Sequence, residues 1–196
     1  PFNAFRDEVR RFVRRPLSQL EPSKELITLA GVVMEVRAKM TARGKIAFVL
    51  LDDGTTPREV SVFSEVFDNN RQRIVIDEVL IVEVKVSNDD FSGGLRIVAD
   101  KLMTLGEARG RFARALQLRL NGEVGEAGGP VAAVDRLQAA LEPFREGDCQ
   151  LRVRYRNAQA EGDLPLGPNW RVRPDDSLLD SLREWLPPGA VEVIYP

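Results

Sequence analysis

The chain has 196 residues, of which 43% are hydrophobic and 30% are charged, and its formal net charge is −2. This composition is typical of a globular protein with one large or two small domains, and no run of about 18 apolar residues predicts a membrane helix. With no histidine and only Cys149, the sequence offers little basis for a zinc site or an activated nucleophile and excludes an internal disulfide. We expect no metal and no cofactor, and the single cysteine favours a reducing compartment, the cytoplasm.

The first residues predict one amphipathic helix. Apolar side chains recur at helical spacing over residues 2–15, and Pro16 is expected to end the helix because it lacks an N–H donor. A solvated face is the simpler interpretation of the arginines between them, which are Arg6, Arg10, Arg11, Arg14 and Arg15. The chain begins Pro1-Phe2-Asn3, without a signal peptide or an initiator Met, so we interpret it as a processed product or an excised fragment of a longer protein.

Residues 26–105 predict five short strands separated by turn signals. The order is three strands, a helix over Ser64–Arg73 and two strands, which is the order of a five-stranded OB-fold barrel; an SH3-like barrel does not normally carry a helix there. Gly31, inside the long first strand, indicates a bulge or bend that lets one strand run through both halves of a small barrel. The expected strands are Leu26–Lys39, Ile46–Leu51, Arg58–Phe63, Val79–Val86 and Leu95–Leu102.

After residue 105 the pattern predicts a small α+β unit. A helix is expected over Gly106–Leu118, and a linker rich in glycine and proline over Asn121–Pro130. Further helices are expected over Val131–Phe144 and Asp175–Leu186, and strands over Cys149–Tyr155 and Val191–Tyr195. The predicted division is 1–25 for the N-terminal helix and linker, 26–105 for the OB-fold, 106–117 for a connecting helix and 118–196 for a C-terminal, partner-binding α+β domain.

No arrangement of residues predicts catalysis. Asp52 and Asp53 are adjacent carboxylates of the kind that can hold Mg²⁺, but neighbours on a strand point to opposite faces and Gly54 follows, so a turn is favoured. Asp89 and Asp90 lie in a second, hairpin turn with Gly93 and Gly94, so a structural role is favoured again, and no helix follows the glycine pair to make a phosphate-binding loop. We therefore predict a binding module without catalytic residues.

The predicted barrel carries candidate contacts for single-stranded DNA. An OB-fold binds single strands across its second and third strands, and the loops after the first and fourth strands close over the groove. The first loop carries Lys39, Arg43 and Lys45, which can contact phosphates, and the second carries Phe91, which can stack on a base. Arg58, at the start of the third strand, completes the predicted contacts. The alternative is that the cations are solvated and Phe91 plugs the barrel end, and the acidic residues beside Phe91 favour weak binding.

The second unit has an arginine-rich strand and two tryptophans. Twelve arginines and no lysine follow Lys101, and the planar guanidinium suits fixed ion-pair contacts. Arginine and tryptophan are enriched at interface hot spots, so we predict a protein-binding surface made by Arg152, Arg154, Arg156, Trp170 and Trp185. The alternative is that a GC-rich genome replaces lysine with arginine and that both tryptophans belong to the core.

Several segments resemble a known family. The runs Leu50–Gly54 and Glu59–Phe63, and the turn Ser87–Leu95 with its Asp-Asp-Phe-Ser-Gly-Gly sequence, look like the OB-fold region of the bacterial replicative polymerase, the DNA polymerase III alpha subunit. The run Leu166–Asp176 looks like the C-terminal domain of that family, and Pro1-Phe2-Asn3 resembles the segment that leads into the OB-fold. The resemblance spans essentially the whole chain.

The resemblance implies specific roles. The OB-fold would lie near the single-stranded template and contact it weakly, and the C-terminal domain would dock the tau subunit of the clamp loader in the replisome. The chain would be the C-terminal piece of a much larger DNA-directed DNA polymerase, a nucleotidyltransferase, and would adjoin the rest of that chain. The family's polymerase aspartates, histidine-rich domain and clamp-binding motif have no counterpart here, so we expect no polymerase activity. The alternative is a purely structural, protein-interaction element without DNA contact.

Overall fold

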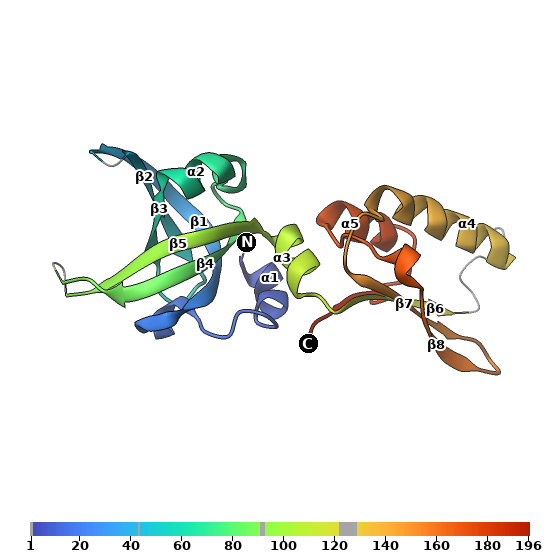
Figure 1. The fold of residues 1–196 in the computed structure, drawn as a ribbon. Helices are drawn as coiled ribbons and strands as arrows, with labels where there is room; N and C mark the ends of the chain where they lie inside the picture. The colour runs from blue at the N-terminus through green and yellow to red at the C-terminus, as the bar shows by residue number, and fades with distance from the viewer. Residues whose placement is uncertain (1, 43, 91–92, 122–128) are drawn as a thin grey trace. The chain divides into compact units, whose positions relative to one another are not determined.

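The computed structural model describes residues 2–42, 44–90, 93–121 and 129–196. It divides into two compact units, Pro1–Leu105 and Gly106–Pro196. Figure 1 shows a closed barrel in the first unit and helices packed on a sheet in the second. The predicted fold class, an OB-fold barrel followed by a small α+β unit, is confirmed.

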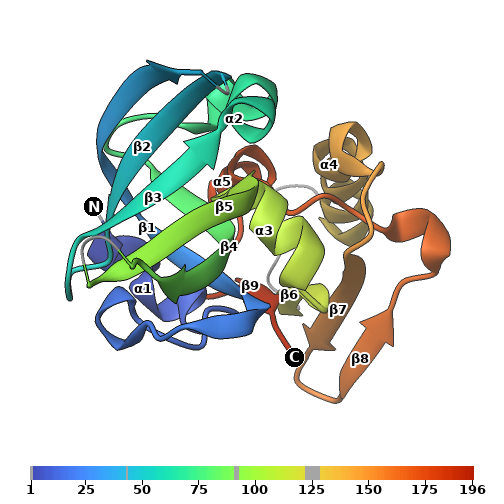
Figure 2. The ribbon, with the colours of Figure 1, turned by 60° about the vertical axis from the view of Figure 1, so that its left-hand side comes forward.

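The barrel has five strands in the order β1-β2-β3-β5-β4. All neighbouring pairs are antiparallel except β3 and β5, which pair in parallel at Ser61 and Val98 and close the ring. The helix α2 (Ser64–Asn70) and a 3-10 turn (Arg71–Arg73) connect β3 to β4, and α2 lies at one end of the barrel (Figure 2). The strands are β1 Ser23–Thr41, β2 Gly44–Asp52, β3 Arg58–Phe63, β4 Val79–Asn88 and β5 Leu95–Thr104.

The first strand runs through both halves of the barrel, as predicted. Its early part pairs with β4 and its late part with β2, and Val32 has a partner in each. A Cβ on Gly31 would lie 3.0 Å from the Leu51 Cβ, so glycine permits the close approach of β1 and β2. The bulge itself falls later, between Val33 and Glu35, and leaves Met34 exposed.

The barrel interior follows from the alternation of side chains along the strands. Every second residue of β2 and β3 points inward, and the next residue points outward. Phe67 of α2 packs against the same cluster. The inward residues of these two strands are at most 1% exposed, and they are Ala47, Val49, Leu51, Val60 and Val62.

The N-terminal helix is shorter than predicted. The helix α1 spans Phe2–Val9 and ends seven residues before Pro16. The Arg10 amide still donates to the carbonyl group four residues back, but the amides of Arg11 and Phe12 donate to carbonyl groups three residues back, so the chain tightens into turns. The prediction of one helix over residues 2–15 is therefore wrong after Val9. A 3-10 turn, Leu17–Gln19, then leads to β1.

The second unit is a four-stranded sheet, in the order β8-β7-β6-β9, with helices on one face (Figure 1). Leucines from β6 and β7 pack against leucines of α4 and α5. Asp175 caps α5 by accepting the N–H of Leu178 at 3.1 Å. The strands are β6 Ala115–Asn121, β7 Gln150–Arg156, β8 Glu161–Pro165 and β9 Val191–Ile194, the helices are α3 Leu105–Phe112, α4 Gly129–Leu141 and α5 Asp176–Arg183, and 3-10 turns span Glu142–Phe144 and Pro168–Trp170.

The prediction for the second unit needs correction at one helix and lacks one strand. The helix predicted over Gly106–Leu118 ends at Phe112, and residues 115–121 form β6 at the centre of the sheet. Leu116 and Leu118 are fully buried on one face, because the period of two in this run matches a strand. A domain start at residue 118, as predicted, would cut through β6. The strand β8 was missed, because its residues are all exposed and show no apolar alternation.

Gly147 and Cys149 hold the start of β7 against a neighbouring segment. A Cβ on Gly147 would lie 2.1 Å from the carbonyl carbon of Val172, so no other residue fits without moving the backbone. Cys149 forms a β-bridge with Val172 and is 1% exposed. Burial raises the pKa of the Cys149 thiol to about 11. The cysteine is thus a small buried residue in a β-bridge, with a thiol that is not activated as a nucleophile.

Candidate functional site

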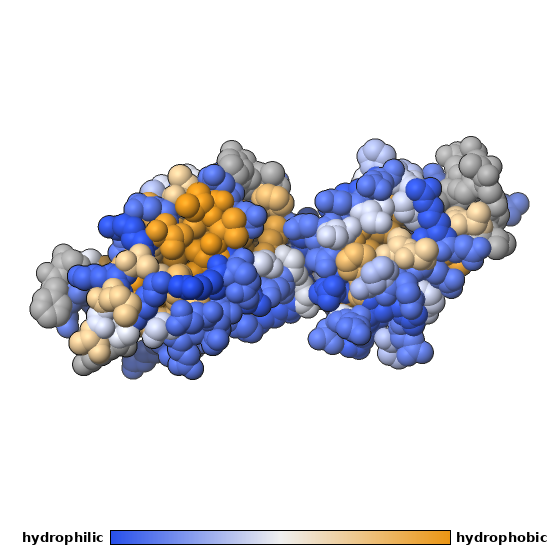
Figure 3. Space-filling model, turned by 90° about the horizontal axis from the view of Figure 1, so that it is seen from above, coloured by the Kyte–Doolittle hydropathy of each residue, from blue (hydrophilic) through white to orange (hydrophobic). Residues whose placement is uncertain are grey.

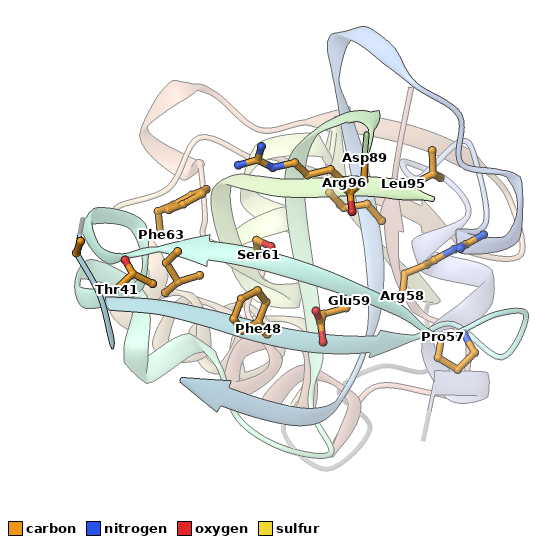
Figure 4. Close-up of a pocket in the computed structure, with 13 residues that line it drawn as sticks. Thr41, Phe48, Pro57, Arg58, Glu59, Ser61, Phe63, Asp89, Leu95 and Arg96 are labelled. Carbon is orange, nitrogen blue, oxygen red and sulfur yellow. The ribbon is translucent and has the colours of Figure 1, made fainter. Parts of the chain in front are cut away.

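A groove of about 880 Å³ crosses the outward face of β2, β3 and β5 (Figure 4). Thr41 and Ala42 line it from the end of β1, and Asp89 lines it from the segment between β4 and β5. The groove therefore lies where strands two and three were predicted to bind a ligand. Its strand residues include Ile46, Phe48, Arg58, Glu59, Ser61, Phe63, Leu95, Arg96 and Ile97.

Two phenylalanine rings line the groove. Phe48 is opposite Ser61 across the β2–β3 ladder, and Phe63 is opposite Ile46. Both rings point outward because their sequence neighbours fill the barrel, and Phe63 keeps 36% of its surface exposed. Open aromatic rings on a sheet face can stack on nucleobases, and that contact tolerates any base.

The charges of the groove are mixed. Arg96 extends along β5 toward the Phe63 end (Figure 4), and the Nε of Arg58 donates to the Leu17 carbonyl at 3.2 Å. Glu59 forms an ion pair with Arg37 on β1, which also pairs with Glu35 at 3.2 Å. Two arginines therefore face the groove, and the carboxylate of Glu59 already has a cationic partner.

The structure separates the five predicted DNA contacts. Arg58 lines the groove. Lys39 is exposed on β1 and does not line the groove, and the Nζ of Lys45 lies 5.1 Å from the centre of the Phe67 ring, against α2. Arg43 and Phe91 lie outside the described residues, so their roles stay predictions.

Sequence reasoning missed the groove residues Phe48, Phe63 and Arg96. The signal for the two rings was present in the alternation of β2 and β3, since inward Val60 and Val62 require Phe63 to point outward. Arg96 is likewise the outward neighbour of buried Ile97. The prediction favoured the loops and did not use the outward positions of the strands.

The adjacent carboxylates Asp52 and Asp53 serve the β2–β3 turn. Asp52 accepts the N–H of Gly54 at 2.8 Å, and Gly54 has a φ of +82°, which favours glycine. Asp53 is buried and accepts the amide N–H groups of Leu17 at 2.8 Å and Thr55 at 3.0 Å. The favoured interpretation of this pair as a turn is confirmed.

The described residues contain neither a cluster of metal ligands nor a helix that could span a membrane. No three histidine, cysteine, aspartate or glutamate side chains in this part of the chain gather as metal ligands would. None of its helices is long and apolar enough to cross a membrane.

The open face of the second sheet carries arginines that are largely paired. Arg154 donates to both carboxylate oxygens of Asp163 on β8, at 2.7 and 3.0 Å. This hydrogen bond from Arg154 lowers the pKa of the exposed Asp163 carboxyl. Arg152 donates twice to the Oε1 of Gln150, at 3.2 and 3.0 Å, and Arg156 is exposed.

The two tryptophans are half-buried and each lies under an arginine. Trp170 has the Arg145 guanidinium 5.1 Å from its ring centre, and Trp185 has that of Arg136 at 4.9 Å. Both rings also pack against the core of the second unit. The two predicted alternatives, a protein-binding surface and a place in the core, therefore both apply in part, because one part of each ring is packed in the core and another part is exposed.

Comparisons with known proteins cover both units. Residues 27–105 match a family model described as an OB-fold nucleic acid binding domain. Residues 136–186 match a model described as the C-terminal domain of DNA polymerase III subunit alpha. The second match contains all five residues predicted to bind a partner.

Relatives match along the whole chain. It is 36% identical to DNA polymerase III subunit alpha of Pseudomonas aeruginosa over 187 residues, covering 94% of this chain and 15% of the relative. It is also 36% identical to the Escherichia coli K12 subunit over 199 residues, covering 100% of this chain and 17% of the relative. The chain thus spans about a sixth of these relatives. Among solved structures, a domain of replication protein A from Methanococcus maripaludis aligns with this chain at 19% sequence identity and a TM-score of 0.38. The alignment covers 46% of this chain and 93% of that domain.

Proposed function

Because this chain is homologous over its whole length to the C-terminal part of bacterial DNA polymerase III alpha subunits, we propose that it is a non-catalytic module of a replicative DNA polymerase. Its OB-fold contacts the single-stranded template weakly, and its second unit docks the tau subunit of the clamp loader. The rest of the polymerase chain is its covalent neighbour.

The DNA half of the proposal is carried by the groove on β2 and β3. The groove combines the rings of Phe48 and Phe63, which can stack on bases, with Arg58 and Arg96, which can contact phosphates. Weak binding follows from the charges, because Asp89 and Glu59 also line the groove.

Replacing the two rings tests the DNA half. Phe48→Ala and Phe63→Ala are each expected to weaken binding of a fluorescent oligothymidine about tenfold, since each stacked base contributes about 1–3 kcal/mol. Tyr155→Ala is the matched control, because this ring in the second unit is 39% exposed, close to the 36% of Phe63. Unchanged affinity in the double variant would remove the groove from the proposal.

The partner half is supported by the surface of the second unit. The half-buried tryptophans with arginines above them provide rigid contact area, and Arg152 and Arg156 add donors. The double variant Arg152→Ala and Arg156→Ala is expected to weaken binding of the tau C-terminal region in a calorimetric titration at least tenfold. Arg183→Ala, on α5, is the control, and equal affinities of all three proteins would contradict the docking surface.

A second candidate function, a packing element without DNA contact, has its own support. Figure 3 shows apolar surface gathered on one face of the barrel unit. Met34, Val75 and Ile76 are 48%, 39% and 56% exposed. The backbone N–H of Asp77 donates to the Val33 carbonyl at 2.9 Å, which brings the two segments together. Such exposed apolar residues suit packing against another domain. Failure of the groove variants to alter DNA binding would favour this function.

The absence of catalysis is tested directly. A primed template with Mg²⁺ and all four nucleotides is expected to show no extension by this chain. Extension that survives repeated purification would contradict the proposal.

A further inference from the structure

A second cavity of the barrel unit, about 410 Å³, is lined by arginines. Arg6 comes from α1, and Arg10, Arg14 and Arg15 come from the turns that follow it. The β2–β3 turn, from Asp53 to Thr55, forms the opposite side. Because the helix ends at Val9, Arg10, Arg14 and Arg15 lie on the segment that follows it, and together with Arg6 they line this one cavity.

These arginines have no carboxylate partner in the described parts of the chain. None of the four forms an ion pair there, and Arg10, Arg14 and Arg15 are exposed. The one acidic lining residue, Asp53, is occupied by the amides of Leu17 and Thr55 and by the Thr55 hydroxyl at 2.5 Å. Four cations against one committed carboxylate leave the cavity positively charged, which attracts anions.

The cavity adjoins one end of the groove through Pro16 and Leu17. Pro16 lines the cavity, and the Leu17 N–H donates to Asp53 in its wall. The Leu17 carbonyl accepts the Nε of Arg58, which lines the groove. A strand that leaves the groove past Arg58 therefore reaches the arginine cavity next.

We propose that this cavity binds the phosphodiester backbone of the same single strand beyond the groove. Guanidinium groups bind phosphate oxygens through paired N–H donors, so the cavity holds the strand without reading its sequence. This inference rests on the proposed DNA contact of the groove. It adds a second, purely electrostatic contact that only strands longer than the groove can reach.

The test compares oligothymidines of two lengths by fluorescence anisotropy, about 5 and about 15 nucleotides, which lie near the two ends of the range of OB-fold site sizes, about 4–16 nucleotides. The triple variant Arg10→Ala, Arg14→Ala and Arg15→Ala is expected to weaken binding of the longer strand and to leave the shorter one within about twofold. The slope of log affinity against log salt concentration for the longer strand should fall by about 2, since each phosphate contact on a single strand contributes about 0.7.

A second triple variant removes the same charge elsewhere. Arg114, Arg171 and Arg183 are exposed in the second unit, and their replacement by Ala should leave both strands unaffected. An equal loss in this control, or an equal loss for both strand lengths in the first variant, overturns the cavity as a site. The inference also fails if the first variant binds the longer strand like the unmodified protein.

The groove variant separates this inference from the proposed function. If the Phe48→Ala, Phe63→Ala protein loses affinity for both strands while the arginine variant loses none, the cavity is wrong and the groove stands. If only the arginine variant loses affinity, the groove contact is wrong, and with it the path that this inference assumes.

Discussion

The groove of the barrel and the open face of the second sheet both present arginines, but the neighbours of those arginines differ. In the groove, Arg96 lies beside the open ring of Phe63. On the second sheet, Arg154 is held by both oxygens of Asp163, and Arg119 pairs with Glu192 at 2.6 Å. The number of arginines on a surface therefore does not determine its electrostatic potential, because each carboxylate that pairs with an arginine cancels one positive charge.

The aromatic residues show the same contrast. The groove rings project from strands and pack on no core of their own, whereas Trp170 and Trp185 pack against the core of the second unit under arginines. Open rings on a sheet suit bases, and half-buried, arginine-capped rings suit a protein partner. The difference assigns nucleic acid to one unit and protein to the other in our proposal.

The largest effect is expected from Gly147→Ala, which should lower the stability of the second unit only. The new Cβ would lie 2.1 Å from the Val172 carbonyl carbon, and we expect unfolding of this unit to become easier by at least about 3 kcal/mol. Urea titration followed by tryptophan fluorescence measures it, because both tryptophans belong to this unit. Gly162→Ala, with no atom within 4 Å of the new Cβ, should stay within about 1 kcal/mol.

Loss of DNA binding in the Gly147→Ala protein would contradict the assignment of DNA to the barrel unit and of protein to the second unit, because all the residues that line the groove belong to the barrel unit. The expected result is a protein whose second unit is destabilised and that binds oligothymidine like the unmodified chain. Equal destabilisation by the two glycine variants would contradict the close contact at Val172.

The thiol of Cys149 reports on the core of the second unit. Its pKa of about 11, against an ordinary 9.0, leaves roughly 100-fold less thiolate at pH 8 than in the unfolded chain, so alkylation should slow by at least that factor. The raised pKa means that the unfolded chain ionises first. Stability is therefore unaffected below about pH 9 and falls as the pH rises from 9 toward 11.

Urea midpoints at pH 8 and pH 10 check the sign of this dependence. The Cys149→Ala protein is the control, because it keeps the titration of every other group. If the drop in stability is as large in the control as in the unmodified protein, the thiol does not contribute.

Removing the carboxylates of the second sheet should make its face resemble a DNA-binding surface. In the double variant Asp163→Asn and Glu192→Gln, Arg154 and Arg119 lose their partners. We expect the slope of log affinity against log salt concentration for oligothymidine to steepen by about 1. Glu146→Gln with Glu184→Gln makes the same charge change at exposed positions that form no ion pair in the described residues, and a matching slope would refute the pairing argument.

The smallest effect is expected from Glu59→Gln in the groove. This change removes a negative charge beside the strand and releases Arg37, so oligothymidine should bind about threefold more tightly, as a charge several ångströms away in water implies. Glu65→Gln, on α2, is the control. Weaker binding by Glu59→Gln would mean that the Arg37–Glu59 pair orders the groove.

The pattern of the sequence was sufficient for the barrel and for part of its site. Val60 and Val62 determine the inward face of β3, and the same alternation places Phe63 on the outside. The position of Arg58 in the groove does not follow from this alternation, because Arg58 has the parity of inward Val60 and Val62; it lies at the start of β3, where its side chain reaches the Leu17 carbonyl. Arg43 and Phe91, predicted from the loops, lie outside the described residues and stay predictions.

By itself, the sequence determined the order of strands and helix along the barrel and the turn at Asp52–Gly54, because these depend on local spacing and local hydrogen bonds. The tertiary structure alone decided which charges are free. Arg37 meets Glu59 across 22 positions, and Leu17 meets Asp53 across 36. It also decided that four of the five N-terminal arginines line one cavity. Such pairings depend on the meeting of segments far apart in the chain, and spacing along the sequence does not contain that information.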